Sequence, residues 1–282
     1  MTNKSAISIL GCGWLGLPLA EVLVQAGYAV KGSTTTLGKL PLLEEKRIEP
    51  YFIDLSSASG TAALPDFLQS ETLLLNIPPR LRSGGGDDYL EQVRVLLAAL
   101  QNSPVQKLLF VSSTSVVPDL NRVVTEEDVP SSEEARTGNP LLWSEYLLRE
   151  GGNWSTTVVR FGGLVGGSRH PGRFLAGKTD VPNSEAPVNL IHLHDCIRVV
   201  LQVLEQGIWD LDFLACADEH PTRREFYTRA ALLSGLTPPK FKAGDSSSFK
   251  IVSNRRLKEE LGFTFSYPDP YLMISGQVPS EV

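Results

Sequence analysis

The chain has 282 residues, of which 42% are hydrophobic and 21% charged, and its formal net charge at pH 7 is −6. That length fits one or two domains with a sizeable core. Without a basic excess, a nucleic-acid partner is disfavoured and a small molecule or nucleotide is favoured. No apolar run suits a signal peptide or a membrane span, so we expect a cytoplasmic protein that binds no membrane.

Three cysteines, Cys12, Cys196 and Cys216, lie far apart in the chain and match no zinc-binding spacing. Cys12 stands in a glycine-rich turn and the other two stand in apolar runs. We therefore expect buried free thiols in a reducing compartment and no metal site.

Apolar runs of strand length alternate with helical patterns in the first part of the chain. We expect strands at 6–10, 28–32, 51–53, 72–77, 107–112 and 156–161. We expect helices at 15–26, 37–45, 87–101 and 141–150. Continuous apolar strands between helices indicate a parallel sheet covered on both faces. Right-handed crossovers then give a doubly wound α/β domain of the Rossmann type.

The composition changes after Gly163. Residues 164–187 are rich in Gly and Pro and carry basic side chains, which indicates a long loop of functional or disordered character. Beyond it we expect a strand at 188–193 and helices at 196–205, 223–233 and 254–261. We therefore predict a dinucleotide-binding domain over 1–165 and a smaller C-terminal α/β, substrate-side domain over 166–282. Residues 187–206 are expected to pack back on the first domain.

Glycines at 11, 13 and 16 follow the first strand and open the first helix. In this context Gly11 allows a tight turn, Gly13 lets the backbone approach a pyrophosphate, and Gly16 lets helix and strand pack closely. The helix N-terminus presents free N–H groups to the phosphates. The alternative is a purely structural bend. We predict that the dinucleotide is held by the turn residues Gly11, Gly13, Trp14, Leu15 and Gly16.

The end of the second strand bears on the choice of cofactor. An NAD site usually has an acid there, whereas KGSTTTLGK has none between Val30 and Lys39. Hydroxyl groups at this point, with Lys31 or Lys39 nearby, suit a 2′-phosphate. The alternative is a polar surface loop. We therefore expect NADP in preference to NAD, bound by Ser33, Thr34 and Thr35.

Several motifs together resemble the extended and atypical short-chain dehydrogenase/reductases of the NAD(P)-dependent epimerase/dehydratase group, and a bacterial epimerase-like branch in particular. The motifs are GCGWLG, FVSSTSVV (110–117), VVRFGGLVGGSRHPGR (158–173), VNLIHLHDC (188–196) and IVSNRRLKEELGF (251–263). The resemblance implies further cofactor contacts at the ends of strands, from Asp54, Asn76, Ile77, Pro78 and Ser112. For Asp54 a turn or helix cap is the alternative.

The resemblance also implies a Ser or Thr, a Tyr and a Lys in the active site, and here the chain departs from it. Ser113 matches the serine, but the best alignment places Leu141 and Glu145 at the Tyr and Lys positions. Leu has no proton to donate and Glu has the wrong charge. Two functions therefore stay open: an NAD(P)-dependent oxidoreductase or epimerase with a replaced acid/base, or a sensor or regulatory protein that binds NAD(P) without turnover.

For the enzyme, the catalytic candidates are Ser113, Tyr146 and His192, although His192 also suits a histidine satisfied in the core. The loop after the sixth strand gathers cationic groups that suit the carboxylate or phosphate of an anionic small-molecule substrate. These are Arg169, His170, Arg173 and Lys178. A solvated basic loop is the alternative.

The resemblance also implies a homodimer, formed through the helices at 87–100 and 141–149. In the first of these, the core-facing stripe is expected to be Leu90, Val93, Leu97 and Leu100. Tyr89, Leu96 and Ala99 are then left for the interface.

Overall fold

The computed structural model describes residues 4–79, 86–244 and 248–275. Packing divides the chain into two compact units, each built from several segments. The first consists of Met1–Ser112, Pro130–Val159 and Val203–Asp212. The second consists of Ser113–Val129, Arg160–Gln202 and Phe213–Val282. The division into a dinucleotide-binding domain over 1–165 and a substrate-side domain over 166–282 stays a prediction.

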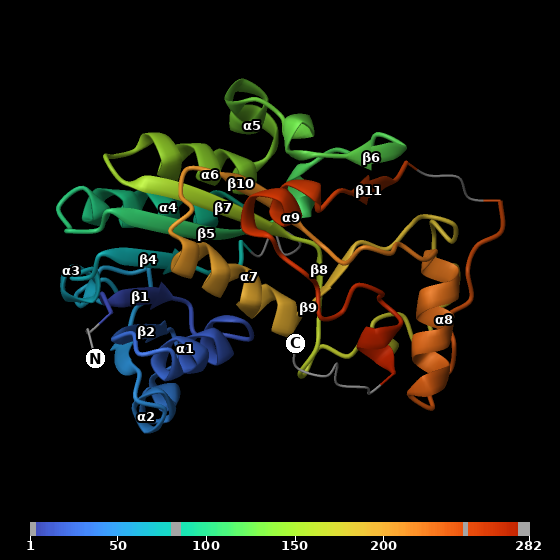
Figure 1. The fold of residues 1–282 in the computed structure, drawn as a ribbon, viewed down its shortest axis with the longest axis horizontal. Coiled ribbons are helices and arrows are strands. Elements are labelled where there is room, and N and C mark those ends of the chain that lie inside the picture. The colour runs from blue at the N-terminus through green and yellow to red at the C-terminus, as the bar shows by residue number, and fades with distance from the viewer. Residues whose placement is uncertain (1–3, 80–85, 245–247, 276–282) are drawn as a thin grey trace. The chain divides into compact units, whose positions relative to one another are not determined.

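A seven-stranded parallel sheet has the order β3-β2-β1-β4-β5-β7-β10, which confirms the doubly wound α/β class. Its strands are β1 (Ile7–Leu10), β2 (Val30–Thr34), β3 (Glu49–Phe52), β4 (Thr72–Leu75), β5 (Lys107–Ser113), β7 (Ser155–Phe161) and β10 (Asp212–Ala215). Every residue of β1 and of β4 is buried, as expected for central strands covered on both faces. In Figure 1 these strands lie beside one another, from blue β1 to yellow-green β7.

The helices of the first unit connect these strands. They are α1 (Gly16–Gln25), α2 (Leu40–Glu45), α3 (Leu64–Phe67), α4 (Gly86–Leu100), α5 (Ser132–Gly138) and α6 (Pro140–Glu150). The Asn139 side chain caps α6 by accepting a hydrogen bond from the Leu142 N–H, and Pro140 occupies the first helical position. Helices α4 and α6 pack against each other, and Figure 1 shows them together.

The buried stripe of α4 differs from the predicted one. The fully buried side chains are Tyr89, Val93, Leu96 and Leu100, whereas Leu90 and Leu97 are only half-buried. Both stripes fit helical periodicity, and in the structure the stripe of Tyr89, Val93, Leu96 and Leu100 is the buried one. The assignment of Tyr89 and Leu96 to a dimer interface was therefore wrong, since both are buried within the chain.

The second unit contains two small sheets and its own core. β6 (Arg122–Val124) pairs in parallel with β11 (Lys250–Val252), and β8 (Gly163–Val165) pairs in parallel with β9 (Leu190–His192). The helices are α7 (Leu193–Gln206), which begins in this unit, α8 (Arg223–Leu233) and α9 (Arg255–Leu261). Thr222 caps α8 through a capping box with Glu225. Phe226, Tyr267 and Ile274 belong to the buried cluster beside α8.

Cys12, Cys196 and Cys216 are buried free thiols, as the sequence analysis expects. In the described part of the chain, no helix combines the length and the apolar character that crossing a bilayer requires. Whether the protein is cytoplasmic stays a prediction.

Candidate functional site

The glycine turn joins the buried strand β1 to helix α1. Gly11 has φ +109°, and a Cβ there would lie 2.5 Å from the Asn76 carbonyl oxygen. A Cβ on Gly16 would lie 2.1 Å from the Gly11 oxygen. The geometry of the fold therefore requires both glycines. Gly13 is different, because a Cβ there would meet no atom of the described residues within 4 Å. Its missing side chain leaves space that the folded chain itself does not use.

The end of β2 holds this turn in place. The Gly11 N–H donates a hydrogen bond to the Ser33 hydroxyl oxygen at 2.9 Å, and the Cys12 N–H donates to the Ser33 carbonyl at 2.8 Å. Asn76, which follows β4, donates from its side-chain amide to the Gly11 carbonyl at 3.2 Å. Ser33 is thus buried and partly committed to the turn, which sequence reasoning did not anticipate.

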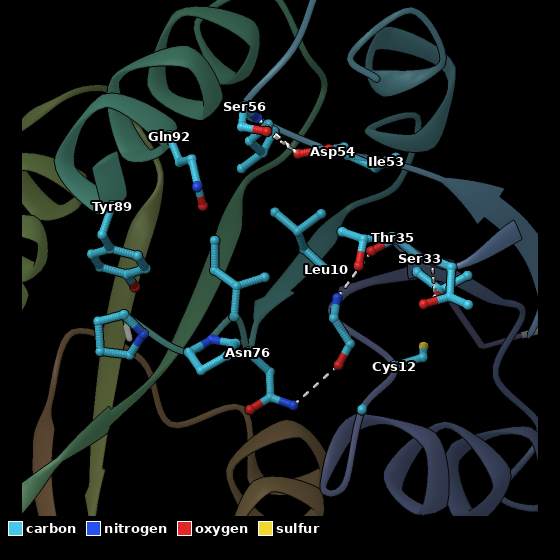
Figure 2. Close-up of a pocket in the computed structure, with 18 of the residues that line it drawn as sticks. Leu10, Cys12, Ser33, Thr35, Ile53, Asp54, Ser56, Asn76, Tyr89 and Gln92 are labelled. Carbon is cyan, nitrogen blue, oxygen red and sulfur yellow. Dashed lines mark hydrogen bonds between the residues drawn. The ribbon is translucent and has the colours of Figure 1, made fainter. Parts of the chain in front are cut away.

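A cavity of about 650 Å³ opens at the carboxyl ends of these strands, all within the first unit. Such ends are where open α/β sheets bind ligands. Many of the predicted cofactor residues line it, and Figure 2 shows the cavity with most of its lining side chains. They are Gly11, Gly13, Ser33, Thr34, Thr35, Asp54, Asn76, Ile77 and Pro78. Other predicted contacts are not among the described lining residues: Trp14, Leu15, Gly16 and Ser112.

The polar groups of the cavity include one lysine. Lys39 lines the cavity with Thr34 and Thr35, and it forms no ion pair within the described residues. Lys31, the other predicted cation, instead donates a hydrogen bond to the Asp66 carbonyl at 2.6 Å and does not line the cavity. Of the two lysines, Lys39 is therefore the one available to an anionic ligand.

Two lining residues are better explained by local structure than by chemistry. One Asp54 carboxylate oxygen accepts hydrogen bonds from the Ser56 N–H at 3.0 Å and the Ser56 hydroxyl at 2.6 Å, which fixes the turn after β3. Burial raises the pKa of the Cys12 thiol to about 12, so this thiol stays protonated at neutral pH and is not a nucleophile.

The helix α6 carries the positions at which the catalytic dyad is missing. Leu141 and Glu145 are both buried. The Ser112 hydroxyl at the end of β5 donates a hydrogen bond to the Glu145 carboxylate at 2.5 Å. Tyr146 lies next to Glu145, but its hydroxyl donates to the Pro130 carbonyl at 2.8 Å, and Tyr146 does not line the cavity.

Helix α4 supplies lining residues that the sequence analysis did not select, namely Asp88, Tyr89 and Gln92. Tyr89 is almost fully buried, and its hydroxyl has no hydrogen-bond partner among the described residues. In the sequence, Tyr89 fits the apolar pattern of the helix. Its hydroxyl, a polar group at an apolar position, is the one signal that could have marked it as a site residue.

The second unit holds the other two catalytic candidates. The Ser113 hydroxyl accepts a hydrogen bond from the Ser115 N–H at 3.1 Å and caps a turn of 3₁₀ helix. The His192 ring stacks on Tyr267, with ring centroids 3.8 Å apart, and its Nδ1 accepts a hydrogen bond from the His194 N–H. Burial lowers the pKa of His192, which favours the neutral ring.

The predicted substrate loop is largely exposed. Arg169, Arg173 and Lys178 are exposed, and the His170 Nδ1 accepts a hydrogen bond from the Gly172 N–H at 3.2 Å. His170 and Arg173 line a second, smaller cavity of about 290 Å³ together with Ser234 and Leu236. The structure thus brings two of the four predicted substrate residues to one cavity.

Known proteins resemble this chain over nearly its whole length. No protein-family model matches. The chain is 36% identical to protein YeeZ of Escherichia coli (strain K12) over 95% of its own length and 98% of the relative's. Two solved structures share the fold. A short-chain dehydrogenase/reductase superfamily protein from Agrobacterium tumefaciens with bound NAD is 20% identical, with a TM-score of 0.73 and coverage of 95% and 94%. UDP-glucose 4-epimerase from Thermotoga maritima with UDP-glucose is 17% identical, with a TM-score of 0.74 and coverage of 95% and 97%.

Proposed function

The chain belongs to the same family as protein YeeZ and has the fold of the NAD-dependent epimerase/dehydratases among the extended short-chain dehydrogenase/reductases. On that premise we propose that it binds a nicotinamide dinucleotide in the cavity at the ends of β1 to β4. The open space at Gly13 carries this proposal, because the folded chain leaves it unfilled at the point where a phosphate can approach the N-terminus of α1. Two further observations concern residues that line the same cavity: among the described residues, the buried Tyr89 hydroxyl has no hydrogen-bond partner and Lys39 forms no ion pair.

NADP is the proposed preference. The end of β2 carries no acid, and Thr34, Thr35 and Lys39 line the cavity there. An ammonium and hydroxyl groups suit a 2′-phosphate better than a bare ribose. The related Agrobacterium tumefaciens protein has bound NAD, so NAD is the alternative that the experiment must separate.

For the reaction, we propose an oxidoreductase or epimerase/dehydratase that acts on an anionic small molecule, with Ser113, Tyr146 and His192 as catalytic candidates. The exposed cations of the 169–178 loop suit a phosphate or carboxylate. The Thermotoga maritima relative in fold is in complex with UDP-glucose, so a nucleotide sugar is the first substrate class to screen. When bound, the nicotinamide supplies the hydride chemistry, and the chain must supply the proton.

The second candidate function, dinucleotide binding without turnover, is favoured by the arrangement around Glu145. A lysine in the family dyad lowers the pKa of the tyrosine. Here a buried carboxylate, bonded to Ser112, occupies the position aligned with that lysine. A negative carboxylate raises the pKa of a nearby tyrosine, so it disfavours the deprotonated tyrosine that the family reaction needs. This supports a sensor or regulatory role.

Calorimetric titration with NADPH, NADP, NADH and NAD tests the proposal. Binding of any of the four supports the site, and tighter binding of the phosphorylated pair supports the NADP preference. If none binds, the site assignment falls. A screen of nucleotide sugars that follows both NADPH absorbance and conversion of the sugar then separates enzyme from sensor, because an epimerase or dehydratase consumes no net NADPH. The predicted homodimer is checked separately by light scattering at micromolar concentration.

A further inference from the structure

Tyr89 lies near the N-terminus of α4 and combines two features that rarely occur together. Its side chain is 2% exposed, yet its hydroxyl makes no hydrogen bond with any described residue. Buried tyrosine hydroxyls usually have a partner, because a desolvated donor without one is costly. Tyr89 is also one of the residues that line the large cavity.

Gln92 lies three residues further along α4 and lines the same cavity. Residues at this spacing share one face of a helix. Gln92 is half-buried, and its amide makes no hydrogen bond within the described part of the chain. Figure 2 shows Tyr89 and Gln92 on the same helix, on the opposite side of the cavity from Ser33 and Cys12. The helix thus presents two unused polar groups to one space.

The surroundings of Tyr89 decide which chemistry its hydroxyl can perform. Helix α6 packs against α4, and the negative charge of Glu145 acts on the Tyr89 hydroxyl. Burial and this charge both raise the pKa of Tyr89, burial being the larger cause. The Ser112 hydroxyl holds the carboxylate by a hydrogen bond. Tyr89 therefore keeps its proton and can donate a hydrogen bond, whereas it is poorly suited to accept a proton as a base.

We propose that the Tyr89 hydroxyl and the Gln92 amide are hydrogen-bond donors to the ligand in this cavity, and that they determine affinity from the α4 side of the site. The inference rests on the proposed dinucleotide site. Their partners on the ligand are oxygen atoms of phosphate or ribose, which a neutral phenol and an amide both recognise. The assignment makes these two residues binding residues and not the missing acid/base.

Tyr89→Phe is the first test, because it removes the hydroxyl alone. That hydroxyl has no hydrogen-bond partner among the described residues of the free chain, so the melting temperature of the free protein is expected to stay unchanged or to rise. By calorimetry, the dinucleotide that binds tightest to the wild type is expected to bind about tenfold more weakly, the factor of one ordinary hydrogen bond. The thermal shift that this dinucleotide produces should shrink accordingly.

Tyr51→Phe is the matched control. The Tyr51 hydroxyl donates a hydrogen bond towards Glu49 or Asp66, at 2.6 Å and 2.7 Å, and Tyr51 does not line the cavity. Its loss is expected to lower the melting temperature and to leave the affinity unchanged, the reverse of Tyr89→Phe. Gln92→Leu provides a second test at a half-buried position, and we expect severalfold weaker binding.

The possible outcomes separate this inference from the proposed function. If the wild type binds a dinucleotide and both Tyr89→Phe and Gln92→Leu bind it equally well, the inference is overturned while the site stands. A lower melting temperature of free Tyr89→Phe with unchanged affinity would assign Tyr89 a purely structural role. If the wild type binds none of the four dinucleotides, the proposed site fails and this inference fails with it.

Discussion

The Ser112 hydroxyl, at the end of β5, donates a 2.5 Å hydrogen bond to the Glu145 carboxylate of α6, and both side chains are buried. A hydrogen bond to a buried charge contributes more than a neutral one, because the carboxylate has lost its water. Glu145 is therefore held as part of the structure at the position where the family resemblance implies a lysine. We therefore expect this hydrogen bond to contribute mainly to the stability of the fold.

Ser112→Ala is expected to lower the free energy of unfolding by about 1.5–3 kcal/mol, the range for a hydrogen bond to a charged group. Urea denaturation would measure the change. Ser115→Ala is the control, since Ser115 is an exposed serine in the following turn and its hydroxyl makes no described hydrogen bond. A change within about 0.5 kcal/mol is expected there. Equal effects of the two substitutions would show that the buried bond adds nothing.

Gly13→Ala is expected to separate binding from folding. A Cβ at this position meets nothing within 4 Å and the backbone lies outside the left-handed region, so the melting temperature should not fall. The added methyl group projects where a pyrophosphate is expected to approach, so dinucleotide affinity should fall by about tenfold or more. Gly138→Ala, equally uncrowded and at the end of α5, should change neither quantity. Normal binding by Gly13→Ala would remove the phosphate role of the turn.

Gly16→Ala tests the structural half of the same turn. Its Cβ would lie 2.1 Å from the Gly11 carbonyl oxygen, a backbone atom that cannot move without displacing β1. We expect a loss of about 1–3 kcal/mol in the free energy of unfolding, as for other overpacked sites. Wild-type stability in a urea titration would mean that the strand–helix junction relaxes easily.

Much of the first unit can be predicted from the sequence, because its strands are short continuous apolar runs between amphipathic helices. The strand β10 (Asp212–Ala215) was not predicted, since four residues among other apolar residues carry no period of their own. The pairing of β6 with β11 was not predicted either, because each strand has three residues and the two lie far apart in the chain.

In the site, the glycine turn was predictable because its three glycines lie within six residues, directly after the first strand and at the start of the first helix. The hydrogen bond from the Gly11 N–H to the Ser33 hydroxyl joins residues 22 apart, and no local pattern indicates it. Tyr89 was assigned to the wrong face because Leu90 and Leu97 fit the helical period as well as Tyr89 and Leu96 do. Which stripe is buried depends on how the rest of the chain packs on α4, and the sequence of α4 alone does not contain that information.

Acid is expected to destabilise the second unit between about pH 7 and pH 5.5. Burial lowers the pKa of both His192 and His220; around His192, the charge of Asp195 opposes this shift and His194 adds to it. The unfolded chain therefore takes up protons near pH 6.5, before the folded chain does, so stability is lost as the pH falls. Melting temperatures across this range would show the decline. The variant His192→Phe keeps the ring contact with Tyr267, and a double variant adds His220→Asn. In both, the melting temperature should depend less on pH. An unchanged dependence would mean that other groups cause the loss of stability.

Lys39→Gln is expected to weaken NADPH binding by about tenfold or more while leaving NADH binding nearly unchanged. The reason is that the ammonium lines the cavity beside Thr34 and Thr35 without an ion-pair partner among the described residues, so a 2′-phosphate would give it its first charged contact. Lys31→Gln is the matched control, because Lys31 donates to the Asp66 carbonyl outside the cavity and should not alter the ratio of the two affinities. Equal weakening of both cofactors would place Lys39 at a phosphate that NADH and NADPH share. If neither changes, the preference for NADP loses its basis, and NAD, the cofactor bound by the Agrobacterium tumefaciens relative, becomes the expected ligand.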